Sequence, residues 1–468
     1  MKWEMSHARF MNASVFLFLD VIVIAASGWL YWLVVSKLIT ISEVGISTSI
    51  YSLVVLTATV IGFGLEYPLL KRTSVDGSKV VSSALLIEIA ATIAVVPLMI
   101  YILIDFYHHE SQSYNLIAVG MLISITLGFV ARYALLGISA SKTILVIDTI
   151  STILKFVTGY LLVLYGFGAL GVLFSFMLQA LVASSTTLII ARRLFGFSIT
   201  NFRYLFDVIK NGVVNMPSIF SRTLIVSLSI VLLASFGVQT SDIGIFYIAL
   251  MISIVTGGLI SSTSYMVIPA SSIAKSDLST SSMRIGLSLT VPIIALLLSS
   301  PEFILSLVGP GYSSGYLILI ILAAGIIPFA IATNSISRFN YLDMPRKLLF
   351  VGGLQICGFI VGFIVLVPLL STVGAALSIL LSYSLSCIPA LIWSEKILLR
   401  YLLNAVIAVL GGVAISDFID IFMPERIISD ITLALTSAII SLVIVFVLKN
   451  TSVQEVRTLI NTMLKNKT

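Results

Sequence analysis

Charge is what this sequence has least of. Only 10% of its 468 residues are charged, three are histidine and two are cysteine. No His or Cys pair has the spacing of a metal site, and no glycine-rich phosphate loop followed by Lys is present. No polar stretch is long enough to form a soluble domain. We therefore expect no enzyme, no catalytic residue, no bound metal or cofactor, and no nucleic-acid partner.

Apolar residues fill the space that charge leaves. The chain is 59% hydrophobic with a mean hydropathy of +1.16, a composition that a water-soluble core cannot accommodate. Lys2 and Arg9 precede an apolar run that is too long for a cleaved signal core, so we interpret it as a retained first span. The composition predicts an all-α, polytopic membrane protein.

Runs long enough to cross about 30 Å of hydrocarbon can be counted along the chain. They form a set of six, a second set of six and a final pair, about fourteen transmembrane helices. The predicted spans are 15–35, 45–66, 80–104, 116–136, 143–164, 168–190, 213–236, 243–268, 285–298, 316–333, 348–369, 373–393, 401–418 and 431–448.

The two sets of six look like copies of one another. The Ser-acid-x-Gly openings at Ser42 and Ser241 each begin a long apolar run that ends near a proline, and they lie roughly 200 residues apart. Arg132 corresponds to Arg338 at nearly the same offset, as does the Gly-Ala pair at Gly168 to the one at Gly374. Because each copy has an even number of spans, the repeats are parallel and enclose a cleft.

The duplication sets the expected domain boundaries. Helical periodicity places amphipathic, membrane-surface helices in the linker and in the tail. The predicted parts are an N-lobe (1–193), an interfacial linker helix (194–212), a C-lobe (213–396), two further helices (397–448) and a cytoplasmic amphipathic tail (449–468).

Charges near the span ends indicate orientation. Fourteen basic residues fall in the loops on one side, whereas only Lys37 and Arg426 fall in the loops on the other, where acidic residues gather. Since Lys and Arg are retained in the cytoplasm, we expect a multi-pass protein of the cell (inner) membrane with both termini cytoplasmic.

Basic residues inside spans are costly unless they face a cavity or a partner. Lys155 lies about halfway through its predicted span and shares a helix face with Asp148, Thr152 and Thr158. Arg222 does the same in the seventh span, with Asn215 on its face. One cation near mid-depth in each lobe predicts a central cationic cavity for a substrate that combines an anionic phosphate with a lipid tail.

Other ionisable groups have two interpretations. Arg132 and Arg338 lie near inner helix ends, where a long basic side chain can reach the interface or join the cavity. The acids are either ion-paired with basic residues or head groups, or they couple transport to H⁺ or Na⁺. These ion-coupling candidates are Asp20, Glu66, Glu88 and Asp148.

Several short motifs resemble one family. The segment from Pro301 to Pro328, with Val-Gly-Pro-Gly-Tyr at 308–312, is similar to the hallmark of the polysaccharide/O-antigen (Wzx-like) flippases. These belong to the multidrug/oligosaccharidyl-lipid/polysaccharide (MOP) superfamily. The Ser42 and Ser241 openings and the Gly-Phe-Gly-Leu-Glu end of the second span also resemble it. The resemblance covers essentially the whole chain and implies two six-helix lobes in a V shape, alternating access and a lipid-linked oligosaccharide as cargo.

Three functions compete on this basis. The first is a monomeric flippase that moves a polyprenyl- or dolichyl-linked oligosaccharide from the cytoplasmic to the outer leaflet, with membrane lipids as its other partners. The second is an H⁺- or Na⁺-coupled multidrug (MATE-type) antiporter with Asp20 as the coupling acid. Mid-depth cations would repel cationic drugs, and such antiporters usually have twelve spans, which favours the flippase. The third, a membrane glycosyltransferase or ligase, is disfavoured by the duplication and by the short outer loops.

Overall fold

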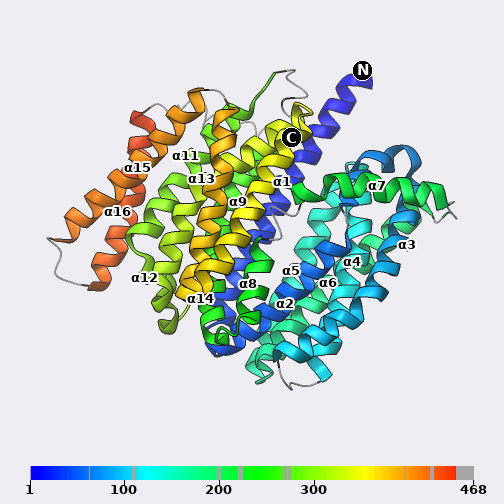
Figure 1. Cartoon of the computed structure of the whole chain (residues 1–468), viewed down its shortest axis with the longest axis horizontal. Coiled ribbons are helices and arrows are strands. Elements are labelled where there is room, and N and C mark those ends of the chain that lie inside the picture. Colours follow the sequence, from blue (N-terminus) through cyan, green and yellow to red (C-terminus); the bar gives the residue numbers. More distant parts are fainter. Residues whose placement is uncertain are drawn as a thin grey trace. The chain divides into compact units, whose positions relative to one another are not determined.

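The structure is a computed structural model. It describes residues 2–448 except 63, 108–111, 197, 199–201, 220–224, 266, 268–270, 272–275, 395 and 422–425. In these residues all regular secondary structure is helical (Figure 1). The helices are α1 (Lys2–Val35), α2 (Ile41–Ile61), α3 (Glu66–Tyr107), α4 (Gln112–Gly137), α5 (Ser141–Leu164), α6 (Gly168–Phe195), α7 (Phe202–Ile219), α8 (Ile225–Ser235), α9 (Thr240–Tyr265), α11 (Ser279–Ser299), α12 (Pro301–Ser306), the 3₁₀ helix η2 (Pro310–Gly315), α13 (Tyr316–Tyr341), α14 (Pro345–Ile392), α15 (Lys396–Asp420) and α16 (Arg426–Val447).

Eleven helices among the described residues are long and apolar enough to cross a membrane. The longest, α14, has 48 residues and bends at Ser371, where φ is 50°, so it supplies two crossings. The bend falls between the two spans predicted at 348–369 and 373–393. Two shorter apolar helices, Leu19–Val35 and Ile225–Ser235, bring the apolar segments to fourteen. The prediction of an all-α polytopic chain with about fourteen crossings is confirmed.

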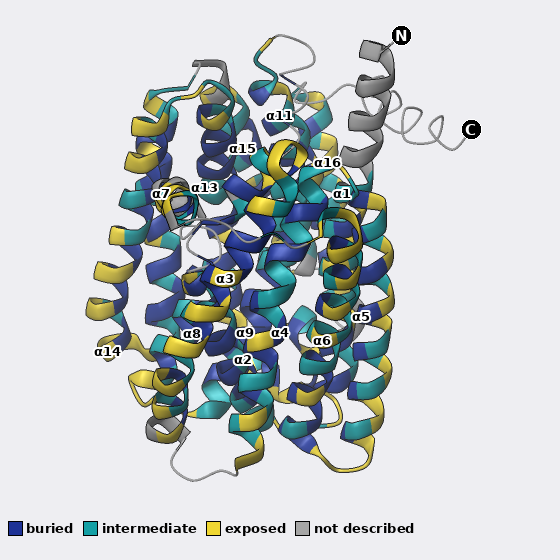
Figure 2. Cartoon of the chain, turned by 90° about the vertical axis from the view of Figure 1, so that its right-hand side faces the viewer, coloured by how far each residue is buried: buried dark blue, intermediate teal, exposed yellow. Residues whose placement is uncertain are grey.

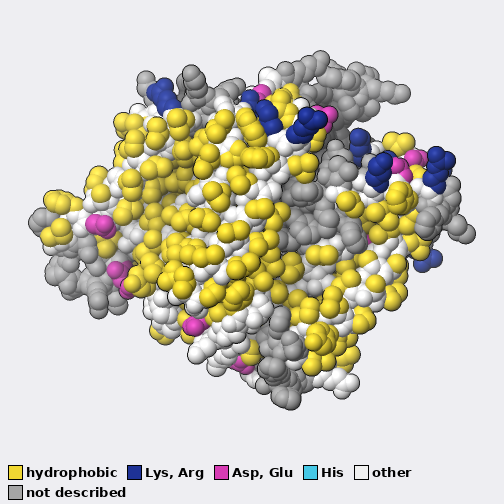
Figure 3. All heavy atoms as spheres, in the orientation of Figure 1, with side chains coloured by type: hydrophobic (Ala, Val, Ile, Leu, Met, Phe, Trp, Pro, Cys, Tyr) yellow, Lys and Arg dark blue, Asp and Glu magenta, His cyan; other side chains and the backbone are white. Residues whose placement is uncertain are grey.

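The outward faces of these helices are apolar. Ile93, Leu369 and Ile392 are each exposed by more than two thirds, and exposed residues lie along the outer sides of the helices (Figure 2). Hydrophobic side chains cover most of the face in Figure 3, with Lys and Arg at helix ends. Exposed apolar surface on this scale is typical of helices that are solvated by lipid rather than by water.

The helices form two compact units. One contains residues 1–247 together with 363–375, and the other contains 248–362 together with 376–468. In the first unit α4 packs on α6 and α3, and α5 packs on α6 and α1. In the second unit α11 packs on α13, α15 and α16. The candidate site described below is built from helices of the first unit.

The two Ser-acid-x-Gly openings meet in the first unit. A Cβ on Gly45 would overlap the carbonyl oxygen of Thr240, and a Cβ on Gly244 would overlap that of Ile41. The hydroxyl oxygens of Ser42 and Thr240 lie 2.6 Å apart, within hydrogen-bond distance. Only glycine allows backbones to approach so closely. The repeated motif therefore places α2 against the first turn of α9.

The linker helix is longer than predicted. We expected it to end at residue 212 and the seventh span to begin at 213, but α7 continues to Ile219. A membrane span and a surface helix share the same 3.6-residue period, so periodicity does not place the boundary between them. The predicted amphipathic tail at 449–468 lies outside the described residues.

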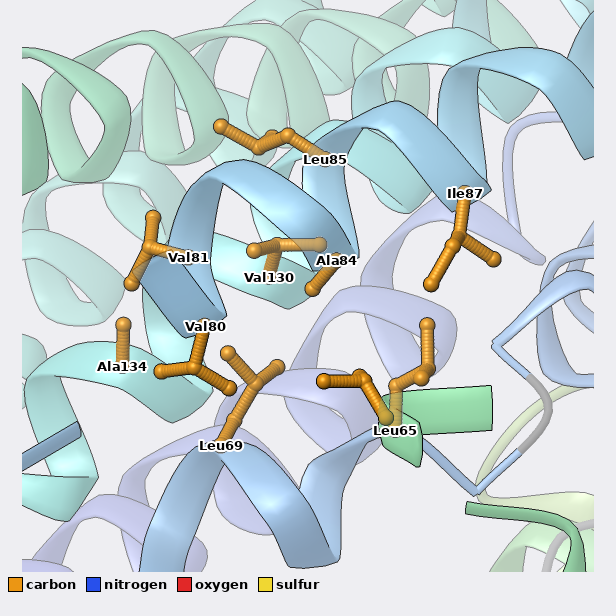
Figure 4. Packing of buried hydrophobic residues seen from close by; sticks show 10 residues of the cluster. Leu65, Leu69, Val80, Val81, Ala84, Leu85, Ile87, Val130 and Ala134 are labelled. Carbon is orange, nitrogen blue, oxygen red and sulfur yellow. The ribbon is translucent and has the colours of Figure 1, made fainter. Parts of the chain in front are cut away.

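α7 lies across the ends of neighbouring helices of its unit (Figure 1). Val208 is fully buried in a hydrophobic cluster with residues of α3 and α4, among them Leu69, Val80 and Val130. Figure 4 shows how the α3 and α4 side chains interlock. The apolar stripe of α7 therefore packs against protein.

Candidate functional site

The polar stripe of α5 faces the interior of the first unit. Asp148, Ser151, Thr152 and Lys155 are all buried, and the Thr152 hydroxyl accepts a hydrogen bond of 3.1 Å from the Gln179 amide of α6. Residues three, four and seven apart share one side of a helix, and this is the side that α5 turns toward α1 and α6. Lys155 therefore does not face lipid.

Aromatic rings enclose the Lys155 ammonium. Its Nζ lies 5.2 Å from the ring centre of Tyr31 in α1 and 5.0 Å from that of Phe176 in α6. The ring faces attract the cation and offset part of its desolvation. The side chain is only 5% exposed. No carboxylate among the described residues forms an ion pair with it.

The rings of Tyr31 and Phe176 form an aromatic cage around Lys155, and further contacts hold these rings in place. The Ser175 hydroxyl donates its one proton to the carbonyl of Val172 at 2.7 Å. The hydroxyl oxygens of Tyr31 and Ser175 lie 2.9 Å apart, so Tyr31 is the donor in the hydrogen bond between them. Trp32 and Tyr51 also pack against Phe176, with ring centres 6.1 and 4.6 Å away. These rings come from α1, α2 and α6, and no signal in the sequence linked them to Lys155.

Arg132 of α4 lies between two predicted coupling acids. It donates from Nη2 to Asp20 of α1 at 2.6 Å and from Nη1 to Asp148 of α5. The other Asp20 oxygen is buried and has no hydrogen-bond partner among the described atoms. Two carboxylates therefore share one guanidinium, which ties α1, α4 and α5 together and leaves one formal negative charge in the cluster.

Glu88 of α3 differs from these acids. It is fully buried, and neither carboxylate oxygen has a hydrogen-bond partner among the described atoms. One turn further along α3, Thr92 donates to Thr126 of α4 at 3.3 Å. Glu66 is half-buried at the start of α3 and makes an interaction of its own. Glu88 is thus the buried acid without a counterion in this part of the structure.

Two further cations were predicted, Arg338 and Arg222, and the structure describes only the first. Arg338 of α13 donates from Nε to Asp277 at 2.6 Å and from Nη1 to the Trp393 carbonyl at 3.2 Å, which places it at a helix end of the second unit. Burial raises the pKa of Asp277, but hydrogen bonds from Ser279 and Arg338 outweigh this and leave that pKa below its ordinary value. Arg222 lies outside the described residues. Asn215 is on α7, and its side chain is not described.

The arrangement around Lys155 is suited to binding an anion. No group of three or more His, Cys, Asp or Glu side chains that could hold a metal ion occurs among the described residues. An ammonium carries three donors, and aromatic faces attract its charge without accepting those protons as an oxygen would. A phosphate oxygen would supply both the charge and the acceptors.

The chain is similar to known proteins in its fold. No protein-family model matches the chain, and neither does any curated protein sequence. Among solved structures the chain is similar to the lipid II flippase MurJ in an inward closed conformation, at 14% identity and a TM-score of 0.71. That match covers 94% of this chain and 99% of MurJ.

Two further similarities are to transporters. An inward-facing multidrug resistance MATE family transporter of the MOP superfamily is 16% identical with a TM-score of 0.59, covering 82% of this chain and 95% of that one. A MOP superfamily transporter from Pyrococcus furiosus, described as having a binding pocket of reversed polarity, is 14% identical with a TM-score of 0.54, covering 84% and 98%. The chain therefore has the fold of the MOP superfamily transporters.

Proposed function

We propose that this protein is a flippase that moves a lipid-linked oligosaccharide from the cytoplasmic to the outer leaflet of the cell membrane. The carrier is a polyprenyl or dolichyl (pyro)phosphate, and the product serves the assembly of cell-surface polysaccharide or glycoprotein. The protein works as a monomer, with both termini in the cytoplasm. The fold and the chemistry around Lys155 support this proposal.

The observation that carries the proposal is the buried Lys155 ammonium in its aromatic cage. The rings of Tyr31 and Phe176 hold the cation. When the transport cycle opens this part of the unit, the same ammonium meets the phosphate of the carrier. A charge-assisted hydrogen bond of this kind is short and strong. Arg222 is proposed as a second cation of the cavity.

Chain coverage favours a flippase over a drug antiporter. The lipid II flippase matches 94% of this chain, whereas the MATE transporter matches 82% although nearly all of its own length is used. The part of this chain that the MATE transporter leaves unmatched is about as long as α15, α16 and the residues that follow them together. This pattern is expected when the cargo requires the two extra C-terminal helices.

Glu88 is the proposed proton site of the flippase. A carboxylate without a counterion in the interior of a membrane protein is strongly disfavoured, so the group is held as the neutral acid. It ionises only when water or a cation reaches α3. Opening and closing of the unit would therefore change whether Glu88 carries a proton, which couples transport to a proton gradient.

A multidrug antiporter is the second candidate. It is supported by the similarity to the MATE transporter and by the net negative charge of the Asp20, Arg132 and Asp148 cluster. In that case a cationic drug would bind where one of the two carboxylates is released from Arg132.

Proteoliposomes distinguish the two candidates. The protein is reconstituted with a lipid-linked oligosaccharide labelled in the inner leaflet, and an external lectin reports the glycan that reaches the outside. Wild type and Lys142→Gln should expose the glycan, whereas Lys155→Gln should not. Lys142 is the matched control because it is an exposed lysine on the same helix. The flippase proposal is overturned if wild type leaves the glycan inside but exchanges a cationic dye for protons.

A further inference from the structure

α7 turns a cationic face away from the protein. Its buried stripe, centred on Val208, packs against α3 and α4. Arg203, Phe206 and Lys210 are exposed on the opposite side, Phe206 by 64%. A typical interfacial helix buries its apolar face in the bilayer. In α7 the apolar face already packs against α3 and α4. Any lipid next to α7 therefore meets its charged face.

The one acid on this face is neutralised. Asp207 lies between Arg203 and Lys210 and accepts a 2.8 Å hydrogen bond from Nη1 of Arg72, on the first turns of α3. No carboxylate among the described residues forms an ion pair with Arg203 or Lys210. The two cations are about 10 Å apart along the helix, and both remain uncompensated.

The same residues line a hollow of about 430 Å³. The hollow is shallow and open, and its lining residues, Arg203, Tyr204, Phe206, Asp207 and Lys210, all belong to α7. Figure 3 shows basic side chains beside hydrophobic ones at the α7 end of this unit. Because α7 crosses the ends of neighbouring helices (Figure 1), a bilayer spanned by those helices would have its lipid head groups at the level of the hollow.

We infer that this hollow is a binding site for the head group of an anionic phospholipid. The phosphate lies between Arg203 and Lys210, and the acyl chains pass Phe206. The bound lipid holds α7 in place and, through the Arg72 and Asp207 pair, the first turns of α3. The site is separate from the transported substrate and does not depend on its identity.

Native mass spectrometry of the full-length protein in detergent tests this directly. The protein is titrated with dioleoylphosphatidylglycerol and, separately, with dioleoylphosphatidylcholine. Wild type should retain the anionic lipid in preference to the zwitterionic one. Each basic residue near an anionic lipid contributes about fivefold in affinity, so Arg203→Gln with Lys210→Gln should bind phosphatidylglycerol about 30-fold more weakly.

Two controls separate the site from general electrostatics and from folding. Lys142→Gln with Arg346→Gln removes the same charge from exposed positions on α5 and α14 and should bind like wild type. Arg203→Lys with Lys210→Arg keeps both charges and should also bind. The inference fails if both lipids are retained equally by wild type, if the Lys142 and Arg346 variant loses as much lipid, or if the charge-preserving exchange abolishes binding.

Discussion

Lys155 and Glu88 are the two buried ionisable residues of the first unit without a counterion among the described residues, and they carry different parts of the account. The lysine is compensated by the rings of Tyr31 and Phe176, whereas Glu88 has no hydrogen-bond partner among the described atoms. By contrast, Arg132 holds Asp20 and Asp148. We therefore propose Lys155 and Glu88 as the groups that exchange a ligand and a proton, whereas Asp20 and Asp148 are ion-paired with Arg132.

The Glu88→Gln substitution should leave the stability of the fold unchanged but remove the coupling of transport to protons. If Glu88 is neutral in the folded protein, the amide has nearly the same shape and charge, so the thermal unfolding midpoint should change little. Transport should then no longer respond to an imposed proton gradient. Glycan translocation measured with and without a pH step tests this. A gradient response equal to that of wild type would show that Glu88 does not bind the coupled proton.

Asp277 should make stability depend on pH in the acidic range. Its folded pKa lies below the unfolded value, so its contribution is complete above the ordinary aspartate pKa of about 3.9 and is lost as pH falls through the folded value. The unfolding midpoint of wild type should exceed that of Asp277→Asn near neutral pH, and the difference should shrink as the solution is made more acidic. A difference that grows on acidification would contradict the ion pair with Arg338.

The contact between α2 and α9 depends on glycine at two matched positions. Gly45→Ala places a methyl group on the carbonyl of Thr240 and should destabilise the protein by about 1–3 kcal/mol. Gly28→Ala in α1 meets nothing within 4 Å and should be neutral or slightly stabilising. Fluorescence-monitored thermal unfolding of both variants provides the comparison. Equal midpoints for the two variants would mean that α2 and α9 do not touch at this point.

Sequence patterns predicted single helices better than the contacts between them. The bend of α14 and the buried stripe of α5 follow from local spacing. The end of α7 does not, because an interfacial helix and a span share one period. The aromatic cage of Lys155 and the pairing of Arg132 with Asp20 join helices far apart in the chain, and no local pattern encodes that proximity.

The duplication was visible in sequence because it places the same residues at the same offset. Ser42 and Thr240 lie within hydrogen-bond distance at the two openings, so a repeat signal also marked a physical contact. The correspondence between Arg132 and Arg338 is looser. Both arginines form ion pairs with aspartates. The partners of Arg132 lie on two helices, α1 and α5, whereas the partner of Arg338, Asp277, lies in a loop.

With fourteen crossings, we expect both ends of the molecule on the same, cytoplasmic side of the membrane. A reporter that is active only in the cytoplasm should work when fused after Thr468 and should fail when fused in the segment between α1 and α2, near Lys37. The excess of Lys and Arg on one set of loops predicts this orientation. Activity at both positions would mean that an even number of crossings lies between Lys37 and Thr468, as expected if the short helix α8 does not cross.

Lys155 is the proposed ligand of a phosphate-bearing lipid, and a binding comparison tests this most directly. Undecaprenyl phosphate and undecaprenol are titrated against purified wild type, Lys155→Gln and Lys142→Gln. Wild type and Lys142→Gln should prefer the phosphate by at least about 10- to 100-fold, the contribution of a hydrogen bond to a charged group, and Lys155→Gln should lose that contribution and keep only the preference due to Arg222. An undiminished preference in Lys155→Gln, or none in wild type, would contradict the account.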